Sequence, residues 1–201
     1  SHSGVGSTGP FRGRKRSLYE GGVRVPFIVR WPEEIPAGRV EDTVVSGVDW
    51  LPTLCDLAGA DTPDGIDGES MADVFRGESR ERESPLMWER RFNVIGEPID
   101  QSPTLSIREG KWKLLMNPDR SRVELYDVPN DPSEMHNLAE EHPEVREELA
   151  ERLLAWKDDL PESKTHVSAG RNEYPWPGEE DFDYMDRRGT VDPSERWGDE
   201  N

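Results

Sequence analysis

The chain has 201 residues, of which 32% are apolar and 34% charged, and 43 acidic against 25 basic side chains give a formal net charge of −18. This length is enough for one domain or two small ones. Because affinity for nucleic acid comes from clustered Lys and Arg, the charge argues against a nucleic-acid partner. No apolar run approaches the roughly 18 residues of a membrane span.

Most of the basic residues are arginines, with twenty Arg and only five Lys. An excess of acids with few lysines is similar to the composition of proteins from high-salt organisms, in which screening weakens the self-repulsion of such a surface. The alternative is an ordinary acidic soluble protein.

The only cysteine, Cys55, excludes an internal disulfide and any multi-cysteine metal site. It lies in an amphipathic stretch, which favours a small buried hydrophobe. The N-terminus has neither a signal peptide nor an initiator Met. We therefore expect a piece of a longer protein, and its localisation stays open.

The first part of the chain predicts a loop, a strand and two helices. Residues 1–22 are rich in glycine, whereas residues 25–31 form a continuous apolar run typical of a strand covered on both faces. Asp49 is a good N-cap for a helix that ends at Gly59. Its expected inward stripe is Leu51, Leu54, Cys55 and Ala58. A shorter helix is expected from Ser70, with Asp73 completing a box-like cap and with Met71, Val74 and Phe75 inward.

From residue 85 the apolar period changes to two, which indicates strands. Glu109-Gly110 separates two alternating runs and predicts a hairpin, and residues 123–127 add a further strand. Pro143 begins a strong helix that should end by Pro161 and cover the sheet. Its apolar stripe is Val145, Leu149, Leu153, Trp156 and Leu160.

The segment with the clearest chemistry is the glycine-rich stretch 9–26. It contains four Arg and one Lys within thirteen positions, in a chain that is otherwise acidic. Concentrated positive charge among the backbone N–H groups of a glycine-rich loop suits an oxyanion such as sulfate or phosphate. The alternative is that the arginines pair with surface carboxylates.

The motif Gly-Pro-Phe-Arg-Gly-x-Lys-x-x-x-Tyr-Glu-Gly-Gly-x-Arg-Val-Pro, from residue 9, closely resembles the second signature region of sulfatases. Three further segments follow in the family's order: Val-Asp-Trp-Leu-Pro-Thr-Leu from residue 48, the Asp64-Gly65 to Ser70 turn, and Leu-Tyr-Asp from residue 125 with Asp-Pro-x-Glu after it. The resemblance covers about residues 5–160. It implies the C-terminal portion of a sulfatase of the alkaline-phosphatase-like superfamily.

This resemblance implies an α/β fold class: the C-terminal part of an alkaline-phosphatase-like fold, with a small antiparallel sheet packed by one long helix. The expected domains are residues 1–80, the end of the main α/β domain, and residues 81–160, the sheet-and-helix subdomain. Residues 161–201 are expected to form an acidic, irregular tail. The expected partners are a sulfate-ester small molecule or saccharide and the missing N-terminal sulfatase portion.

In such enzymes a formylglycine made in a Cys-x-Pro-x-Arg motif attacks sulfur, and Asp and Asn side chains hold a divalent cation, usually calcium. By position Lys15 is the residue that contacts the sulfate. Cys55 is followed by Asp-Leu-Ala, so it is not the precursor of the nucleophile. Calcium is expected in the full-length family member with its ligands outside this chain, and this chain alone is expected to be inactive.

Three other residues near the motif have weaker assignments. His2 is a candidate substrate contact or proton donor, although a lone His at a terminus is more often passive. Arg12 and Arg24 are interpreted as architecture, and Arg24 is expected to pair with a carboxylate such as Glu20 rather than touch substrate.

Two further groups are interpreted as structural. Asp127, Asp131, Glu134 and His136 have loose metal-ligand spacing, but Asn130-Asp131-Pro132 is ordinary turn and cap chemistry. Trp88, Trp112 and Trp156 fall on inward stripes and are expected in the core rather than in a carbohydrate platform.

The leading hypothesis is therefore a sulfuric ester hydrolase, to which this chain contributes Lys15. A phosphonate or phosphodiester hydrolase of the same superfamily is the nearest enzymatic alternative. A stand-alone, non-catalytic module that binds an anion or a partner is the alternative of a different class. The sequence gives no indication of which ester is the substrate.

Overall fold

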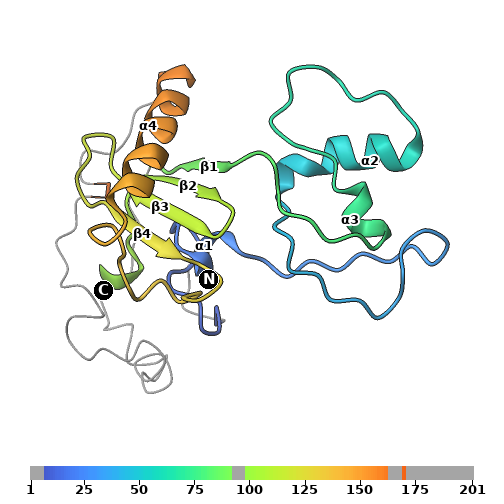
Figure 1. The fold of residues 1–201 in the computed structure, drawn as a ribbon, viewed down its shortest axis with the longest axis horizontal. Helices are drawn as coiled ribbons and strands as arrows, with labels where there is room; N and C mark the ends of the chain where they lie inside the picture. The colour runs from blue at the N-terminus through green and yellow to red at the C-terminus, as the bar shows by residue number, and fades with distance from the viewer. Residues whose placement is uncertain (1–6, 92–97, 163–168, 171–201) are drawn as a thin grey trace, which may run out of the picture. The chain divides into compact units, whose positions relative to one another are not determined.

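A computed structural model describes residues 7–91, 98–162 and 169–170 (Figure 1). The chain divides into two compact units, one formed by residues 1–25 with 87–201 and the other by residues 26–86. The predicted domain boundaries at residues 80 and 160 stay predictions.

The first unit is built on a four-stranded sheet in the order β1-β2-β3-β4. The strands are β1 (Leu86–Glu89), β2 (Leu105–Glu109), β3 (Trp112–Met116) and β4 (Glu124–Asp127). β3 pairs antiparallel with both β2 and β4. The predicted hairpin is present: Glu109 pairs with Trp112, and Gly110 adopts a left-handed φ of 52° in the two-residue turn between them.

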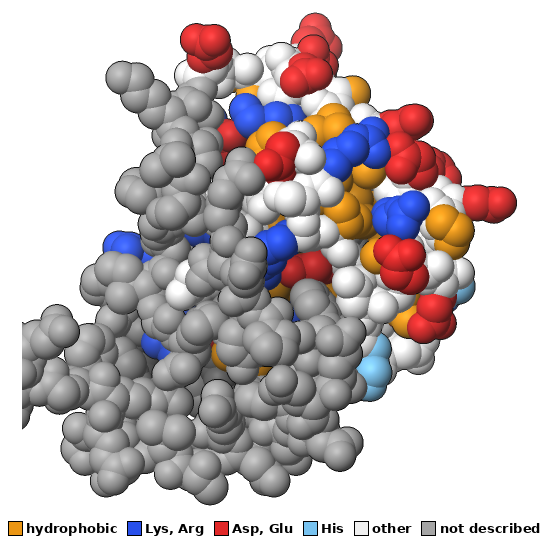
Figure 2. Space-filling model, turned by 90° about the vertical axis from the view of Figure 1, so that its left-hand side faces the viewer, with side chains coloured by type: hydrophobic (Ala, Val, Ile, Leu, Met, Phe, Trp, Pro, Cys, Tyr) orange, Lys and Arg blue, Asp and Glu red, His pale blue; other side chains and the backbone are white. Residues whose placement is uncertain are grey.

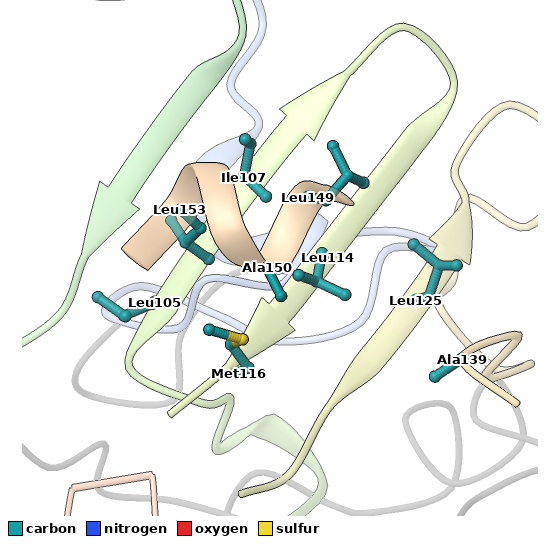
Figure 3. Close-up of a cluster of buried hydrophobic side chains, with 9 residues drawn as sticks. All are labelled: Leu105, Ile107, Leu114, Met116, Leu125, Ala139, Leu149, Ala150 and Leu153. Carbon is teal, nitrogen blue, oxygen red and sulfur yellow. The ribbon is translucent and has the colours of Figure 1, made fainter. Parts of the chain in front are cut away.

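One face of this sheet is apolar and lies against α4 (Pro143–Asp159), as the period-two pattern predicts. Figure 3 shows the α4 side chains above those of the central strands. Trp112 and Trp156 pack against this cluster, which confirms their assignment to the core. The buried residues are Leu105, Ile107, Leu114, Met116, Leu125, Ala139, Leu149, Ala150 and Leu153.

The opposite face of the sheet carries charged and aromatic side chains. The register pairs Arg108 with Lys113, and Lys113 with Tyr126, so the three side chains lie on the same face. Leu18 and Tyr19 cover this face and form a second buried cluster with Leu115, Tyr126 and Val128. The short helix α1 (Glu20–Val23) follows directly. The glycine-rich stretch therefore packs on a polar sheet face.

The second unit contains the turn η1 (Gly47–Asp49), α2 (Trp50–Ala58) and α3 (Ala72–Arg76). Gly59 ends α2 at a left-handed φ of 65°, as predicted. Met71, Val74 and Phe75 form its small buried cluster. Arg82 donates two hydrogen bonds to the buried carboxylate of Asp49, which also accepts the N–H of Ser46.

Three details of the second unit differ from expectation. Residues 25–31 form neither a strand nor a helix, and Ile28 is 91% exposed. A strand covered on both faces requires neighbouring strands, and the four described strands all lie within residues 86–127. Leu51 and Leu54 of α2 are exposed, and its buried residues are Pro52 and Thr53. At the start of α3, Ser70 Oγ accepts the N–H of Ala72 at 3.3 Å, but the Asp73 carboxylate accepts the N–H of Val74 instead of completing the predicted box.

The charged side chains on the face drawn in Figure 2 are mixed in sign. Lys and Arg lie scattered among Asp and Glu there rather than in one patch. Within the described part of the chain, no helix combines the length and the apolar character that crossing a membrane requires.

Truncating the main core should destabilise the first unit. Leu114 is fully buried between the sheet and α4. We expect Leu114→Ala to lower the free energy of unfolding by about 3 kcal/mol, because it removes apolar contacts and leaves a cavity. The control Val25→Ala, at a side chain that is 75% exposed, should change it by less than about 0.5 kcal/mol. Urea denaturation followed by far-UV circular dichroism measures both; equal losses would contradict this core assignment.

Candidate functional site

The basic loop, which we define as residues 9–24, folds back on itself. The N–H of Ser17 donates to the carbonyl of Arg14 at 2.9 Å, and the N–H of Gly21 donates to the carbonyl of Arg12 at 2.6 Å. Inside the turn, Arg16 adopts a φ of 84°, a left-handed conformation that is strained for any residue with a Cβ. The surrounding hydrogen bonds hold this conformation.

Two glycines permit the close approach of backbone segments in the loop. A Cβ at Gly22 would lie 2.1 Å from the carbonyl oxygen of Ser17, and one at Gly21 would lie 2.5 Å from that of Arg12. No side chain fits these distances. Backbone packing therefore requires both glycines of the Glu-Gly-Gly part of the motif.

Lys15 lies in the turn of the loop and is exposed. Its ammonium makes no hydrogen bond or ion pair with any of the residues that the structure describes. By contrast, its neighbour Arg14 pairs with Asp100 at 2.8 Å. Lys15 thus presents a charge that no described carboxylate neutralises.

Arg12 is buried and structural, as expected. Its guanidinium donates to the carbonyl of Ile99 at 2.9 Å, to the hydroxyl of Tyr126 at 3.2 Å and to the carbonyl of Glu134 at 3.1 Å. It also stacks over the ring of Tyr19 at 3.9 Å. These contacts fix the beginning of the loop to the sheet.

Arg24 makes contacts within the loop. Its guanidinium lies 3.8 Å from the carboxylate of Glu20, one helical turn earlier, and 4.6 Å from the centre of the Phe11 ring. The predicted pair of Arg24 and Glu20 is therefore present.

The polar sheet face holds a buried charge network, which we define as Glu20, Arg108, Lys113 and Glu134. The ammonium of Lys113 donates to Glu20 Oε1 at 2.9 Å and lies 2.9 Å from Glu134 Oε1. The guanidinium of Arg108 donates to Glu20 Oε2 at 3.3 Å. Glu134 Oε2 accepts the backbone N–H of Glu20 at 2.6 Å. The end of the basic loop is thereby tied to β2 and β3 and to the segment after β4.

The two carboxyl groups of this network have pKa values shifted in opposite directions. Complete burial, together with the charge of Glu20, raises the pKa of Glu134 to about 7 despite the opposing effect of the nearby Lys113. Lys113 and Arg108 lower the pKa of Glu20, overcoming the opposing effect of its own burial. Lys113 therefore pairs mainly with an ionised Glu20. Glu134 Oε1, although close to Lys113, forms no aligned hydrogen bond.

The buried hydroxyls beside the network are partners of Glu124. Tyr19 donates to Glu124 Oε2 at 2.8 Å and Tyr126 donates to the same atom at 3.2 Å. Burial and the charge of Glu124 raise the pKa of Tyr126 well above its ordinary value. Both hydroxyls consequently stay protonated donors.

The loosely spaced acidic group after β4 has ordinary structural roles. Asp127 pairs with Lys111, and Asp131 accepts the N–H groups of Met135 and His136. Among residues 7–91, 98–162 and 169–170, no three His, Cys, Asp or Glu side chains form a group able to hold a metal ion. His2, the other candidate, lies outside the described residues.

Sequence reasoning assigned no role to Lys113 or Arg108 and treated Glu134 only as a weak metal candidate. The available signal was their place in the strand pattern: Arg108 and Lys113 occupy alternating positions opposite the apolar stripe. That pattern alone is also typical of a solvated face, which is why it did not indicate burial.

Gly22 should not tolerate a side chain. We expect Gly22→Ala to destabilise the first unit by about 2 kcal/mol or more, because the added Cβ would overlap the Ser17 carbonyl. A Cβ at Gly47 meets nothing within 4 Å, so Gly47→Ala is the control and should be nearly neutral. Thermal unfolding of the two variants checks this, and equal melting temperatures would contradict the tight packing of the loop.

The raised pKa of Glu134 predicts a pH-dependent stability. Between its ordinary value of 4.5 and about 7, the folded chain retains a proton that the unfolded chain has released. Stability from this group is present at low pH and is lost as the pH rises through about 7. Relative to Glu134→Gln, the wild-type chain should lose about 2 kcal/mol between pH 5 and pH 8, at about 1.4 kcal/mol per pKa unit.

Urea titrations of both chains at several pH values measure this difference. The exposed Glu151 is the control site, and the Glu151→Gln curve should run parallel to that of the wild type. A Glu134→Gln curve that is also parallel to the wild type would show that Glu134 has an ordinary pKa.

Comparisons with known proteins identify the family of the chain. The family model described as N-sulphoglucosamine sulphohydrolase, C-terminal, matches residues 8–159. The chain is 31% identical over 164 residues to an N-acetylglucosamine-6-O-sulfatase of Bacteroides thetaiotaomicron, covering 76% of this chain and 29% of that protein. It is 30% identical over 165 residues to an N-acetylgalactosamine-6-O-sulfatase of the same organism, covering 74% of this chain and 30% of that protein.

A solved structure from work on glycosaminoglycan metabolism in Bacteroides thetaiotaomicron superposes with a TM-score of 0.60 at 29% identity, covering 75% of this chain and 32% of that one. The chain thus spans about a third or less of the length of these relatives. Because the family model matches most of the sequence and the relatives are sulfatases, the chain belongs to the sulfatases of the alkaline-phosphatase-like superfamily and corresponds to their C-terminal portion.

Proposed function

We propose that the full-length protein hydrolyses sulfate esters of saccharides and that Lys15 of this chain contacts the sulfate group. The observation that carries this proposal is the exposed Lys15 ammonium without a described partner, on a loop whose buried Arg12 and Glu20 are hydrogen-bonded to Tyr126 and Lys113 of the sheet. The names of the relatives support the substrate class, since two are 6-O-sulfatases of amino sugars. A further structure, with a TM-score of 0.51, is described as a complex with its substrate D-glucosamine-2-N,6-O-disulfate.

Lys15 has a simple chemical task in this proposal. Its ammonium offers three donors and one positive charge on a flexible stem. Placed beside a sulfate oxygen, it offsets the negative charge that grows there as the ester bond breaks. The rigid backbone of the basic loop sets the point from which the side chain reaches.

The remaining machinery is proposed to lie elsewhere in the full-length protein. The sequence contains no Cys-x-Pro-x-Arg motif, and the described residues offer no group fit to hold calcium. We assign the formylglycine and the calcium ligands to the part of the full-length protein that precedes this chain. An upstream sequence without Cys-x-Pro-x-Arg and Asp-Asn-Gly would refute the proposal.

Removing the Lys15 charge should impair catalysis in the full-length protein. We expect Lys15→Ala to lower kcat/KM on a sulfated amino sugar about 100-fold, the effect of losing one charged contact to the transition state. The control Lys111→Ala removes the same charge from an exposed lysine that pairs with Asp127 and should leave kcat/KM within about twofold.

Matched sulfate, phosphate and phosphonate esters separate the enzymatic alternatives. Preferred turnover of the sulfate ester supports a sulfatase, whereas preferred turnover of a phosphonate or phosphate ester would replace it by a hydrolase of the same superfamily. A Lys15→Ala enzyme as active as the wild type would remove Lys15 from the site.

A further inference from the structure

The position of Lys15 depends on the backbone of its loop, because no described side chain holds the lysine itself. The hydrogen bond from the Ser17 N–H to the Arg14 carbonyl closes the turn around Lys15. A second hydrogen bond, from the Gly21 N–H to the Arg12 carbonyl, joins the two ends of the loop. Both bonds lie within the loop. Two contacts outside the loop hold its middle, from Arg14 to Asp100 and from the N–H of Leu18 to Ser102 Oγ, and further contacts orient its two ends on the sheet.

Glu134 contacts both of these ends. Its backbone carbonyl accepts from the Arg12 guanidinium, before Lys15 in the chain, and its carboxylate accepts from the N–H of Glu20, after Lys15. Glu134 is fully buried and adopts a left-handed φ of 54°. A non-glycine residue in this conformation is strained, and such strain persists where the surroundings require it. Here it lets one residue direct its carbonyl and its carboxylate to two ends of the same loop.

Lys113 completes the connection. Its side chain is fully buried on β3 and its ammonium lies 2.9 Å from an oxygen of each carboxylate, Glu20 and Glu134. Removing either carboxylate leaves a buried charge with fewer partners, which is strongly unfavourable. The three groups are therefore expected to respond as a unit, and a change in Glu134 is felt at Glu20.

We propose that Glu134, held by Lys113, is a positioning residue that sets the loop carrying Lys15 in its sulfate-contacting place. Glu134 makes no described contact with the Lys15 side chain. It acts on Lys15 through the backbone of residues 12–20. This inference rests on the proposed sulfatase function for its catalytic part, but its structural part concerns the loop alone.

The structural part is tested by hydrogen–deuterium exchange of the 201-residue chain at constant pH. At pH 8, where Glu134 is ionised, Glu134→Gln should accelerate exchange of the Glu20, Gly21 and Gly22 amides about tenfold, the effect of replacing a charged acceptor by a neutral one. Amides of β3 should keep wild-type rates. The control Lys111→Met, on the neighbouring hairpin turn and outside the network, should change neither set. Uniform acceleration in the loop and the sheet would show a general loss of stability and overturn the proposal.

The catalytic part is tested by a double-mutant cycle in the full-length protein. If Glu134 acts through Lys15, Glu134→Gln should lower kcat/KM about tenfold in the wild-type background and leave the Lys15→Ala enzyme unchanged. Additive losses in the double variant would overturn the proposal, because a purely structural residue lowers activity whatever stands at position 15.

Two further arms keep these outcomes separate. If Glu134→Gln does not fold, Glu134→Asp replaces it, because the shorter side chain keeps the charge but withdraws the carboxylate from the Glu20 N–H. This variant should also accelerate amide exchange in the loop and not in the sheet. Wild-type exchange rates in Glu134→Asp would refute the proposal. If the full-length wild-type protein hydrolyses no sulfate ester, the proposed function fails, while the exchange experiment still decides whether Glu134 holds the loop.

Discussion

The structure of the first unit depends on the burial of one ammonium, that of Lys113, between two carboxylates on the polar face of the sheet. A charge without water is tolerated only when it is paired, so each member of the network requires the others. This requirement joins segments far apart in the chain, since Lys113 and Glu20 are separated by 93 positions. The charge network therefore fixes the position of the basic loop on the sheet.

The two faces of the same sheet are held in different ways. The face under α4 is an apolar cluster in which residues of similar volume can replace one another at modest cost. The face under the basic loop uses buried ion pairs and aligned hydrogen bonds, which demand particular atoms at particular distances. Apolar packing thus supplies stability, and the polar face fixes the position of the basic loop.

Local signals explain what the sequence predicted well. The hairpin at Gly110, the helix beginning at Pro143 and the pair of Arg24 with Glu20 each depend on residues a few positions apart. The burial of Lys113 and Glu134 depends on partners distant in the chain, and no local pattern distinguishes it from a solvated strand face. Residues 25–31 show the reverse case: their composition predicts a strand, but a strand forms only with partners, and the described residues supply none.

The exposed apolar side chains of the second unit, among them Ile28, Leu51 and Leu54, have a consequence for the chain in solution. Apolar surfaces of this kind favour self-association, while a formal charge of −18 keeps like molecules apart. Added salt screens the repulsion and leaves the apolar attraction in place. We therefore expect ionic strength to control self-association of the chain, with low salt favouring separate copies.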